Sequence, residues 1–306
     1  MNRNFAVKLF GGFAPIIFAL VSLALIFANR SSVVYGTPLL ATLLYIVFVG
    51  INYLLVSFIS TRAYVQSGNV SFLLLGSSLV VAGCSALLTF SLSSAPNYSA
   101  TVADLGFFFS AMLNLVSALC VYTGVGESPA KSKKSRSVAI PAAVYSALAL
   151  LSALIAVLAL KGLTPVLFVQ GVGGTLLRQE VVAASAILFG ISSLVFLKMS
   201  FETHSDIMFW YSGGLAMLAL CFFSVFFLNV VGGELSWIGR IAQYLSGIYF
   251  LMLVLTSTKE RPEASNTRSP EMPDQVTPHT VQRDSSSLSS VQLERSSSEL
   301  TELETS

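Results

Sequence analysis

Residues 138–160 read VAIPAAVYSALALLSALIAVLAL and contain no charged side chain. A hydrocarbon core about 30 Å thick requires roughly 20 consecutive apolar residues for one helical crossing. This stretch is long enough for that crossing, and longer than a typical soluble core helix would supply. The alternation over about ten residues that marks a membrane β-strand is absent from it. The segment therefore predicts a transmembrane α-helix.

The composition extends this prediction to most of the chain. The 306 residues are 54% hydrophobic and only 10% charged, with a mean hydropathy of +0.77. Soluble domains carry about 25% charged residues. We therefore expect an all-α, polytopic transmembrane bundle of about eight spans. The expected spans are residues 10–28, 38–60, 70–91, 104–125, 138–160, 181–198, 207–230 and 237–257.

Positive charges in the short loops predict the orientation of these spans. With the N-terminus inside, ten Lys and Arg residues fall in cytoplasmic segments and four in outer segments. The cytoplasmic set is Arg3, Lys8, Arg62, Lys131, Lys133, Lys134, Arg136, Lys198, Lys259 and Arg261, and the outer set is Arg30, Lys161, Arg178 and Arg240. We therefore expect a multi-pass cell-membrane protein whose bundle occupies residues 1–257 and whose termini are both cytoplasmic.

The composition changes abruptly after the last expected span. Residues 258–306 lack aromatic side chains and are rich in Ser, Glu, Thr and Pro. Such a segment cannot bury enough apolar surface to offset its chain entropy. This predicts a disordered cytoplasmic tail. Its serines are candidates for phosphorylation, although the composition favours a plain solvated tether.

Several classes of function are disfavoured by the residues present. A net charge of +2 gives no reason to expect nucleic acid as a partner. Cys84, Cys120 and Cys221 fall in separate apolar stretches, where cysteine acts as a small packing residue. There is no HExxH motif, no Ser/His/Asp arrangement and no pair of intramembrane carboxylates. We therefore expect neither an enzyme nor a metal or cofactor site.

Ionisable and amide groups gather at two places on the predicted outer side. One is the loop KGLTPVLFVQGVGGTLLRQE at residues 161–180, and the other is SWIGRIAQYLSGIY at residues 236–249. The groups expected at similar depth are Asp104, Arg178, Gln179, Glu180, Glu234, Arg240 and Gln243. Two interpretations remain open. In the first, the groups form a polar site or an ion-pair latch between the loop and the last helix, because ionisable residues in membrane spans usually have a functional role. Alternatively, the arginines simply extend to lipid headgroups.

The glycines of this loop do not form a phosphate-binding loop. A P-loop requires GxxxxGK[ST] after a strand, and this loop has neither the preceding strand nor the lysine. Gly171, Gly173 and Gly174 instead predict a tight turn that dips toward the membrane surface. Leu167 and Phe168 would seat that turn among headgroups or in a cavity of the bundle.

Two asparagines, Asn52 and Asn114, are the polar residues deepest in the expected bundle. They either line a pathway or hydrogen-bond neighbouring helices together, and the second role is the commoner one. An ion transporter usually shows intramembrane acids or broken helices at matching positions in two halves. The sequence shows neither feature, which leaves a small-solute transporter or channel as the alternative function.

Several stretches together resemble a known class of module. They are LFVQGVGGTLLRQEVVAASAILFGISSLVFL (167–197), SDIMFWYSGGLAMLAL (205–220), WIGRIAQYLSGIYFLMLVL (237–255) and, in style, TRAYVQSGNVSFLLLGSSLVVAGCSALL (61–88). The module is the multi-helix membrane-associated sensor region (MASE-like) at the N-terminus of archaeal and bacterial sensory histidine kinases with PAS domains. The resemblance covers residues 35–257, and its most specific motifs are GxGGTxLRQ and WxGRxxQYxxGxY.

The resemblance implies a prokaryotic, stand-alone sensor-like or interaction module. In that family the last helix continues into a signalling domain, whereas no PAS-like or kinase pattern follows Lys259 here. The module would detect an extracellular or membrane-embedded signal and relay it to a separate cytoplasmic protein; a homo-oligomer is the other partner considered. The resemblance points to Gly171, Gly173, Thr175, Arg178, Gln179, Trp237, Gly239, Arg240, Gln243, Tyr244, Gly247 and Tyr249. The ligand-binding residues we expect are Gly171, Gly173, Thr175, Arg178, Gln179, Glu180, Trp237, Arg240, Gln243 and Tyr244.

Overall fold

The computed structural model describes residues 3–28, 38–68, 70–93, 95–124, 138–169, 173–227 and 233–259. The chain divides into one unit at Met1–Arg261 and a second at Pro262–Ser306. All the described residues belong to the first unit. The basic cluster at 131–136, Gly171 and nearly all of the tail expected at 258–306 lie outside the described residues.

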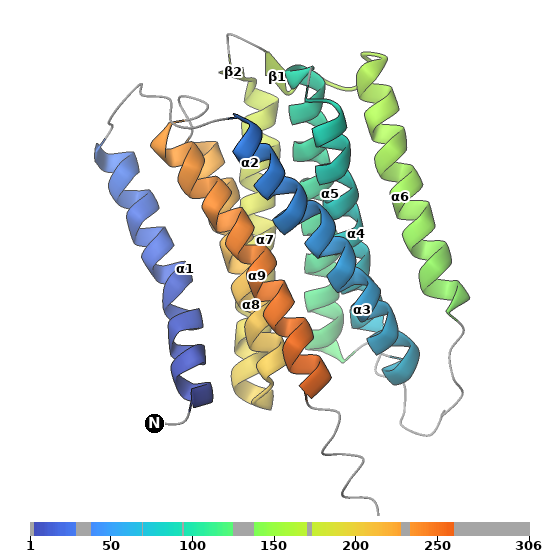
Figure 1. Cartoon of the computed structure of the whole chain (residues 1–306), viewed down its shortest axis with the longest axis vertical. Coiled ribbons are helices and arrows are strands. Elements are labelled where there is room, and N and C mark those ends of the chain that lie inside the picture. Colours follow the sequence, from blue (N-terminus) through green and yellow to red (C-terminus); the bar gives the residue numbers. More distant parts are fainter. Residues whose placement is uncertain are drawn as a thin grey trace, which may run out of the picture. The chain divides into compact units, whose positions relative to one another are not determined.

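The described unit is a bundle of long helices, as the sequence predicts (Figure 1). Its elements are α1 (Arg3–Ala28), α2 (Pro38–Tyr45), the π-helix η1 (Ile46–Ile51), α3 (Asn52–Ser67), α4 (Val70–Ser91), α5 (Pro96–Thr123), α6 (Ala139–Leu160), β1 (Phe168–Val169), β2 (Gly173–Gly174), α7 (Leu176–Thr203), α8 (Asp206–Phe226) and α9 (Glu234–Lys259). Among the described residues, eight helical segments are long and apolar enough to cross a membrane, with α2, η1 and α3 forming one of them. The chain is therefore a multi-pass membrane protein.

Two helices extend well beyond the apolar windows that predicted them. α5 begins at Pro96 rather than near residue 104, and α7 runs from Leu176 to Thr203 rather than from 181 to 198. Hydropathy detects only the apolar part of a helix, whereas the hydrogen-bonded backbone continues through polar residues. Proline at the first helical position lacks only an N–H that has no helical partner there. As a result, Asp104 lies well inside α5, and Arg178 belongs to the first turn of α7.

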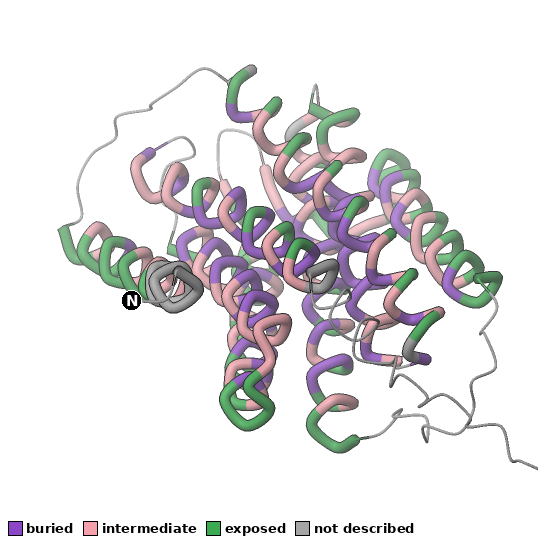
Figure 2. The backbone as a smooth tube through the Cα atoms, turned by 60° about the horizontal axis from the view of Figure 1, so that its bottom comes forward, coloured by how far each residue is buried: buried purple, intermediate pink, exposed green. Residues whose placement is uncertain are grey.

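The helices α4, α5, α7, α8 and α9 pack closely together, while α1 and α6 lie at opposite flanks of the bundle (Figure 1). Of the apolar window in α4, 61% is buried, against 6% in α1 and 22% in α6. In Figure 2 the buried residues follow the faces that the inner helices turn toward one another. The outward Leu, Val and Phe side chains need no protein cover, because lipid tails are as apolar as they are.

The start of α1 and the end of α9 lie at the same end of the bundle, which we call the tail end (Figure 1). The strands β1 and β2 lie at the opposite end, which we call the hairpin end. The starts of α7 and α9 lie at the hairpin end as well, so the two sequence stretches that contain the unusual residues share this end of the bundle.

The two deep asparagines hydrogen-bond helices together, as the commoner of the two interpretations predicts. Asn52 Nδ2 donates to the backbone oxygen of Gly247 at 2.5 Å. Asn114 Oδ1 accepts hydrogen bonds from Ser78 Oγ at 3.2 Å and from the Tyr211 hydroxyl. Asn114 Nδ2 donates to the Ser110 oxygen at 2.9 Å. In lipid, where water is absent, such bonds hold helices in register.

The second membrane segment is not a uniform α-helix, because its middle forms the π-helix η1. The wider turn of η1 lies directly against α9. A Cβ added to Gly247 would overlap the Phe48 carbonyl oxygen and lie 2.9 Å from Asn52 Nδ2. Only a glycine at position 247 allows the two backbones to approach this closely.

We expect Gly247→Ala to separate α9 from η1 and to lower the free energy of unfolding by about 2 kcal/mol, because an inserted methyl group overpacks the contact. Gly190→Ala is the matched control, since a Cβ there would lie 4.0 Å from the Ala219 Cβ, an ordinary contact. Denaturation of the detergent-solubilised variants would measure both effects. Equal stability of the two variants would contradict the close approach.

Candidate functional site

The loop between α6 and α7 forms a small β-hairpin over one end of the bundle. β1 pairs antiparallel with β2, with Phe168 opposite Gly174 and Val169 opposite Gly173. Gly173 has φ 111°, a conformation that other residues rarely adopt. Leu167, just before β1, has no exposed surface, so it anchors the hairpin in the bundle. Gly173 and Gly174 therefore form the second strand of the hairpin, whereas Gly171 and the rest of the turn expected there lie outside the described residues.

Thr175 fastens the hairpin to the start of α7. Its hydroxyl donates to the backbone oxygens of Val166 and Leu167, at 3.0 and 3.1 Å. The same oxygen accepts a hydrogen bond from the Arg178 backbone N–H at 3.3 Å, which caps the helix. A threonine in this position satisfies one of the N–H groups that every helix start leaves unpaired. The cap fixes the direction in which the first turn of α7 presents Arg178.

Arg178 forms a largely buried ion pair with Asp104 of α5. Arg178 Nε lies 2.6 Å from Asp104 Oδ2, and the side chains are 17% and 8% exposed. The guanidinium carbon also lies 5.4 Å from the centre of the Phe168 ring of the hairpin. Arg178 is therefore paired within the protein and does not simply extend to headgroups. Its partner lies on α5, and not on the last helix as the latch interpretation supposes.

The second arginine, Arg240 of α9, faces a separate polar cavity. Its guanidinium carbon lies 5.4 Å from the centre of the Trp237 ring. The cavity has a volume of about 290 Å³ and draws on α2, α4, α5 and α9. Its lining residues are Ala41, Thr42, Tyr45, Thr89, Phe90, Ser93, Ser99, Arg240, Gln243 and Tyr244. Such a cavity is at the small end of those that hold small molecules.

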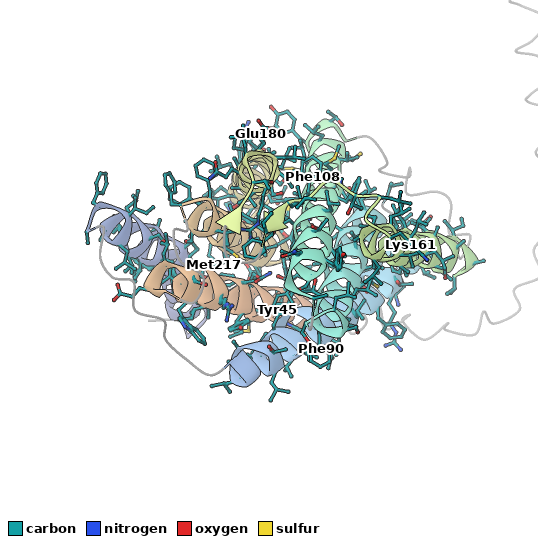
Figure 3. All side chains as sticks on the ribbon, turned by 90° about the horizontal axis from the view of Figure 1, so that it is seen from above. Tyr45, Phe90, Phe108, Lys161, Glu180 and Met217 are labelled. Atoms are coloured by element: carbon teal, nitrogen blue, oxygen red, sulfur yellow. The ribbon has the colours of Figure 1, made fainter. Side chains whose placement is uncertain are left out.

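The cavity walls are held in place by α9. The Tyr244 hydroxyl donates to the backbone oxygen of Ala41 at 2.8 Å, which joins α9 to α2. Tyr45 and Gln243 both line the cavity, so α2 and α9 share its wall. Seen from the hairpin end, Tyr45 and Phe90 lie on one side of the bundle, and Glu180 lies at the opposite rim (Figure 3).

Asp104 connects the ion pair to this cavity. Tyr45, which lines the cavity, and Cys221 of α8 both lie in the neighbourhood of Asp104. Arg240 also lies in the neighbourhood of Cys221. These groups therefore lie together in one part of the bundle as a polar cluster. We call it the hairpin-end cluster: Tyr45, Asp104, Arg178, Cys221, Arg240 and Gln243.

The structure brings some of the expected site residues together and separates others. Gly173, Thr175 and Arg178 lie on the hairpin side of Asp104, and Arg240, Gln243 and Tyr244 lie on the cavity side. Gln179 and Glu180 are exposed on the first turn of α7. Trp237 lies on a shallow, largely apolar surface depression with Val21, Leu25, Glu234 and Ile238. Gly171 lies outside the described residues.

Sequence reasoning gave Tyr45 and Cys221 no place in the site. Asp104 carried a usable signal, since an acid in an apolar segment usually has a functional or pairing role. Tyr45 carried none, because a tyrosine within an apolar run resembles any other packing residue. Within the described ranges, no group of three or more His, Cys, Asp or Glu side chains is placed to hold a metal ion.

Neither a protein-family model, nor a curated protein, nor a solved structure matches the chain. We therefore base its function on the geometry of the hairpin-end cluster and its cavity.

We expect Asp104→Asn to lower the free energy of unfolding by about 3 kcal/mol, because it leaves the Arg178 charge buried without a partner. The control is Glu202→Gln, which breaks the ion pair of Lys198 and Glu202, whose side chains are each 57% exposed. An exposed pair contributes under about 1 kcal/mol. Denaturation in detergent compares the two. Equal losses in both variants would show that the Arg178–Asp104 pair is not buried as described.

Proposed function

We propose that the protein is a membrane sensor-like module that binds a small polar ligand in the cavity beside Arg240. A shift of α9 then relays the signal to a separate protein on the tail side. One observation carries this proposal: three cavity residues, Arg240, Gln243 and Tyr244, belong to α9. α9 is the last membrane helix among the described residues and runs to Lys259. In the sensor proteins that the sequence resembles, a signalling domain follows the last helix.

The contacts below the cavity provide a physical route for the signal. Tyr45 is the last residue of α2, and η1 begins directly after it. One turn after Gln243, Gly247 packs on the Phe48 backbone of η1 and accepts the Asn52 hydrogen bond. A ligand that moves Tyr45 therefore moves η1 against α9. Short π-helices frequently occur at functional sites.

The motif WxGRxxQYxxGxY, which gives the last helix its resemblance to sensor regions, separates here into two sets of residues. Arg240, Gln243 and Tyr244 line the cavity. Gly247 and Tyr249 pack the helix, and the Tyr249 hydroxyl donates to the Gly11 backbone oxygen on α1. Along α9 the cavity residues are thus followed directly by the packing residues, which supports transmission of a signal along the helix.

Orientation is the second part of the proposal: we place the hairpin end outside and the tail end in the cytoplasm. Arg62 and Lys198 lie near the tail end, and positive residues favour the cytoplasmic side. With an even number of spans, both termini are then cytoplasmic. The signal would enter from outside and leave toward the tail.

Cysteine labelling tests this orientation directly. In a background in which the three native cysteines are replaced by alanine, we expect Leu163→Cys to react with a membrane-impermeant maleimide in intact cells. Leu163 lies in the loop after α6 and is 73% exposed. We expect Glu202→Cys, near the other end of α7, to react only after permeabilisation. Reaction of both positions from the same side would contradict the eight-span orientation.

A small-solute transporter is the alternative, and η1 is the observation that favours it. Interrupted helices beside a binding site are typical of transporters. Against it, hydrogen bonds join α3 to α9 beneath the cavity: one of 2.5 Å between the Tyr53 hydroxyl and Ser246 Oγ, and the Asn52–Gly247 bond. Transporters also place their sites near the middle of the membrane, whereas this cavity lies toward the hairpin end.

We expect a ligand found by thermal-shift screening of small polar metabolites to change the signal of a fluorophore attached at Thr256→Cys, near the end of α9. The same ligand should give no flux into liposomes above that of protein-free vesicles. Arg240→Gln should remove the fluorophore response. Robust flux driven by that ligand would refute the sensor proposal and support the transporter.

A further inference from the structure

The charges around the cavity are unbalanced. Between the described residues, the ion pairs are Arg178 with Asp104 and Lys198 with Glu202, so Arg240 has no acidic partner there. Arg240 is also the one charged side chain that lines the cavity. A cation at the edge of an apolar bundle is costly to leave without a counter-charge.

We infer that the cavity beside Arg240 binds an oxyanion, the phosphate or carboxylate group of a small molecule or of a lipid headgroup. This inference rests on the proposed function, because it names the chemistry of the ligand that the sensor would detect. Arginine is well suited to this task, since its planar guanidinium donates two parallel hydrogen bonds to such groups.

The other lining residues complement an anion. Gln243 contributes an amide, and Tyr45, Ser93 and Ser99 contribute hydroxyl groups. Within the described part of the chain, Ser93 and Ser99 form no side-chain hydrogen bond, so their hydroxyls are available as donors. Charge-assisted hydrogen bonds from such groups are roughly twice as strong as neutral ones.

The nearby carboxylate does not oppose an anion. Asp104 does not line the cavity, and its charge is matched by Arg178 at 2.6 Å. The anion would therefore meet a single uncompensated positive charge. The volume of about 290 Å³ suits a small acid or a headgroup fragment. Ala41 and the half-exposed Phe90 provide an apolar wall for the remainder of the molecule.

Trp237 provides an internal reporter for the test. The chain has two tryptophans, Trp210 and Trp237. Trp210 is buried, whereas Trp237 lies under the Arg240 guanidinium at 5.4 Å. An anion that engages Arg240 changes this cation–ring contact and so the Trp237 fluorescence. Trp237→Phe is the control: loss of the fluorescence change in this variant assigns the change to Trp237 and not to Trp210.

The experiment uses the full chain in a maltoside detergent, titrated at constant ionic strength with inorganic phosphate, acetate or phosphatidylglycerol. We expect a saturable fluorescence change with at least one of these probes. Arg240→Gln should weaken binding by about tenfold or more, which is the typical effect of losing a hydrogen bond to a charged group. Arg62→Gln is the matched control, because Arg62 lies over Phe58 on α3, away from the cavity, and should retain wild-type affinity.

Saturation with phosphate or acetate supports a soluble anion, and saturation with phosphatidylglycerol alone supports a lipid headgroup. The inference is overturned if the wild-type protein saturates with none of the probes, a result that does not depend on the folding of any variant. It is also overturned if a folded Arg240→Gln variant binds as the wild type does. If an anion binds but the fluorophore at Thr256→Cys does not respond, the sensor proposal is contradicted and this inference stands. If that fluorophore responds only to a cation or a neutral ligand, this inference is contradicted and the sensor proposal stands.

Discussion

A carboxylate enclosed by apolar helices requires a positive partner, and the pair of Asp104 with Arg178 meets that requirement here. Breaking such a pair leaves an uncompensated charge in a medium that solvates it poorly. The pair joins α5 to α7, and through the Phe168 ring it also holds the hairpin in place. Because Arg178 matches Asp104, Arg240 is left as the positive charge that faces the cavity. The positive charge of the candidate site thus depends on the Arg178–Asp104 ion pair.

The rest of the bundle obeys the packing rules of helices in lipid. In lipid no hydrophobic force drives the helices together, so they associate through close backbone packing and through hydrogen bonds between helices. Aromatic side chains lie on glycines: a Cβ at Gly213 would overlap Tyr249, and one at Gly76 would overlap the Tyr145 hydroxyl. Gly247 against η1 follows the same rule. The π-helix η1 is thus packed tightly against α9 directly beneath the cavity. A small displacement of η1 there would also displace α9.

Much of this fold can be predicted from sequence, because length and hydropathy alone define a membrane helix. The ends of the helices cannot be predicted in this way. α5 includes Asp104 and α7 includes Arg178, whereas hydropathy treats both residues as lying at or beyond the end of a helix. The two arginines and the carboxylate could be recognised as unusual, but their pairing could not. It depends on how α5 and α7 face each other. The π-helix and Tyr45 had no sequence signal, because their residues are as apolar or as ordinary as those of any packed helix.

The most direct test of the role of the Arg178–Asp104 pair is a comparison of phosphate affinity between Arg178→Gln and the double variant Arg178→Gln/Asp104→Asn. Arg178 does not line the cavity, so it has no direct contact with an anion there. The single variant leaves the Asp104 charge unmatched near Arg240 and should bind phosphate more weakly than the wild type. The double variant removes that charge and should recover most of the affinity. A double variant as weak as the single one, or a single variant that binds as the wild type does, would contradict this account.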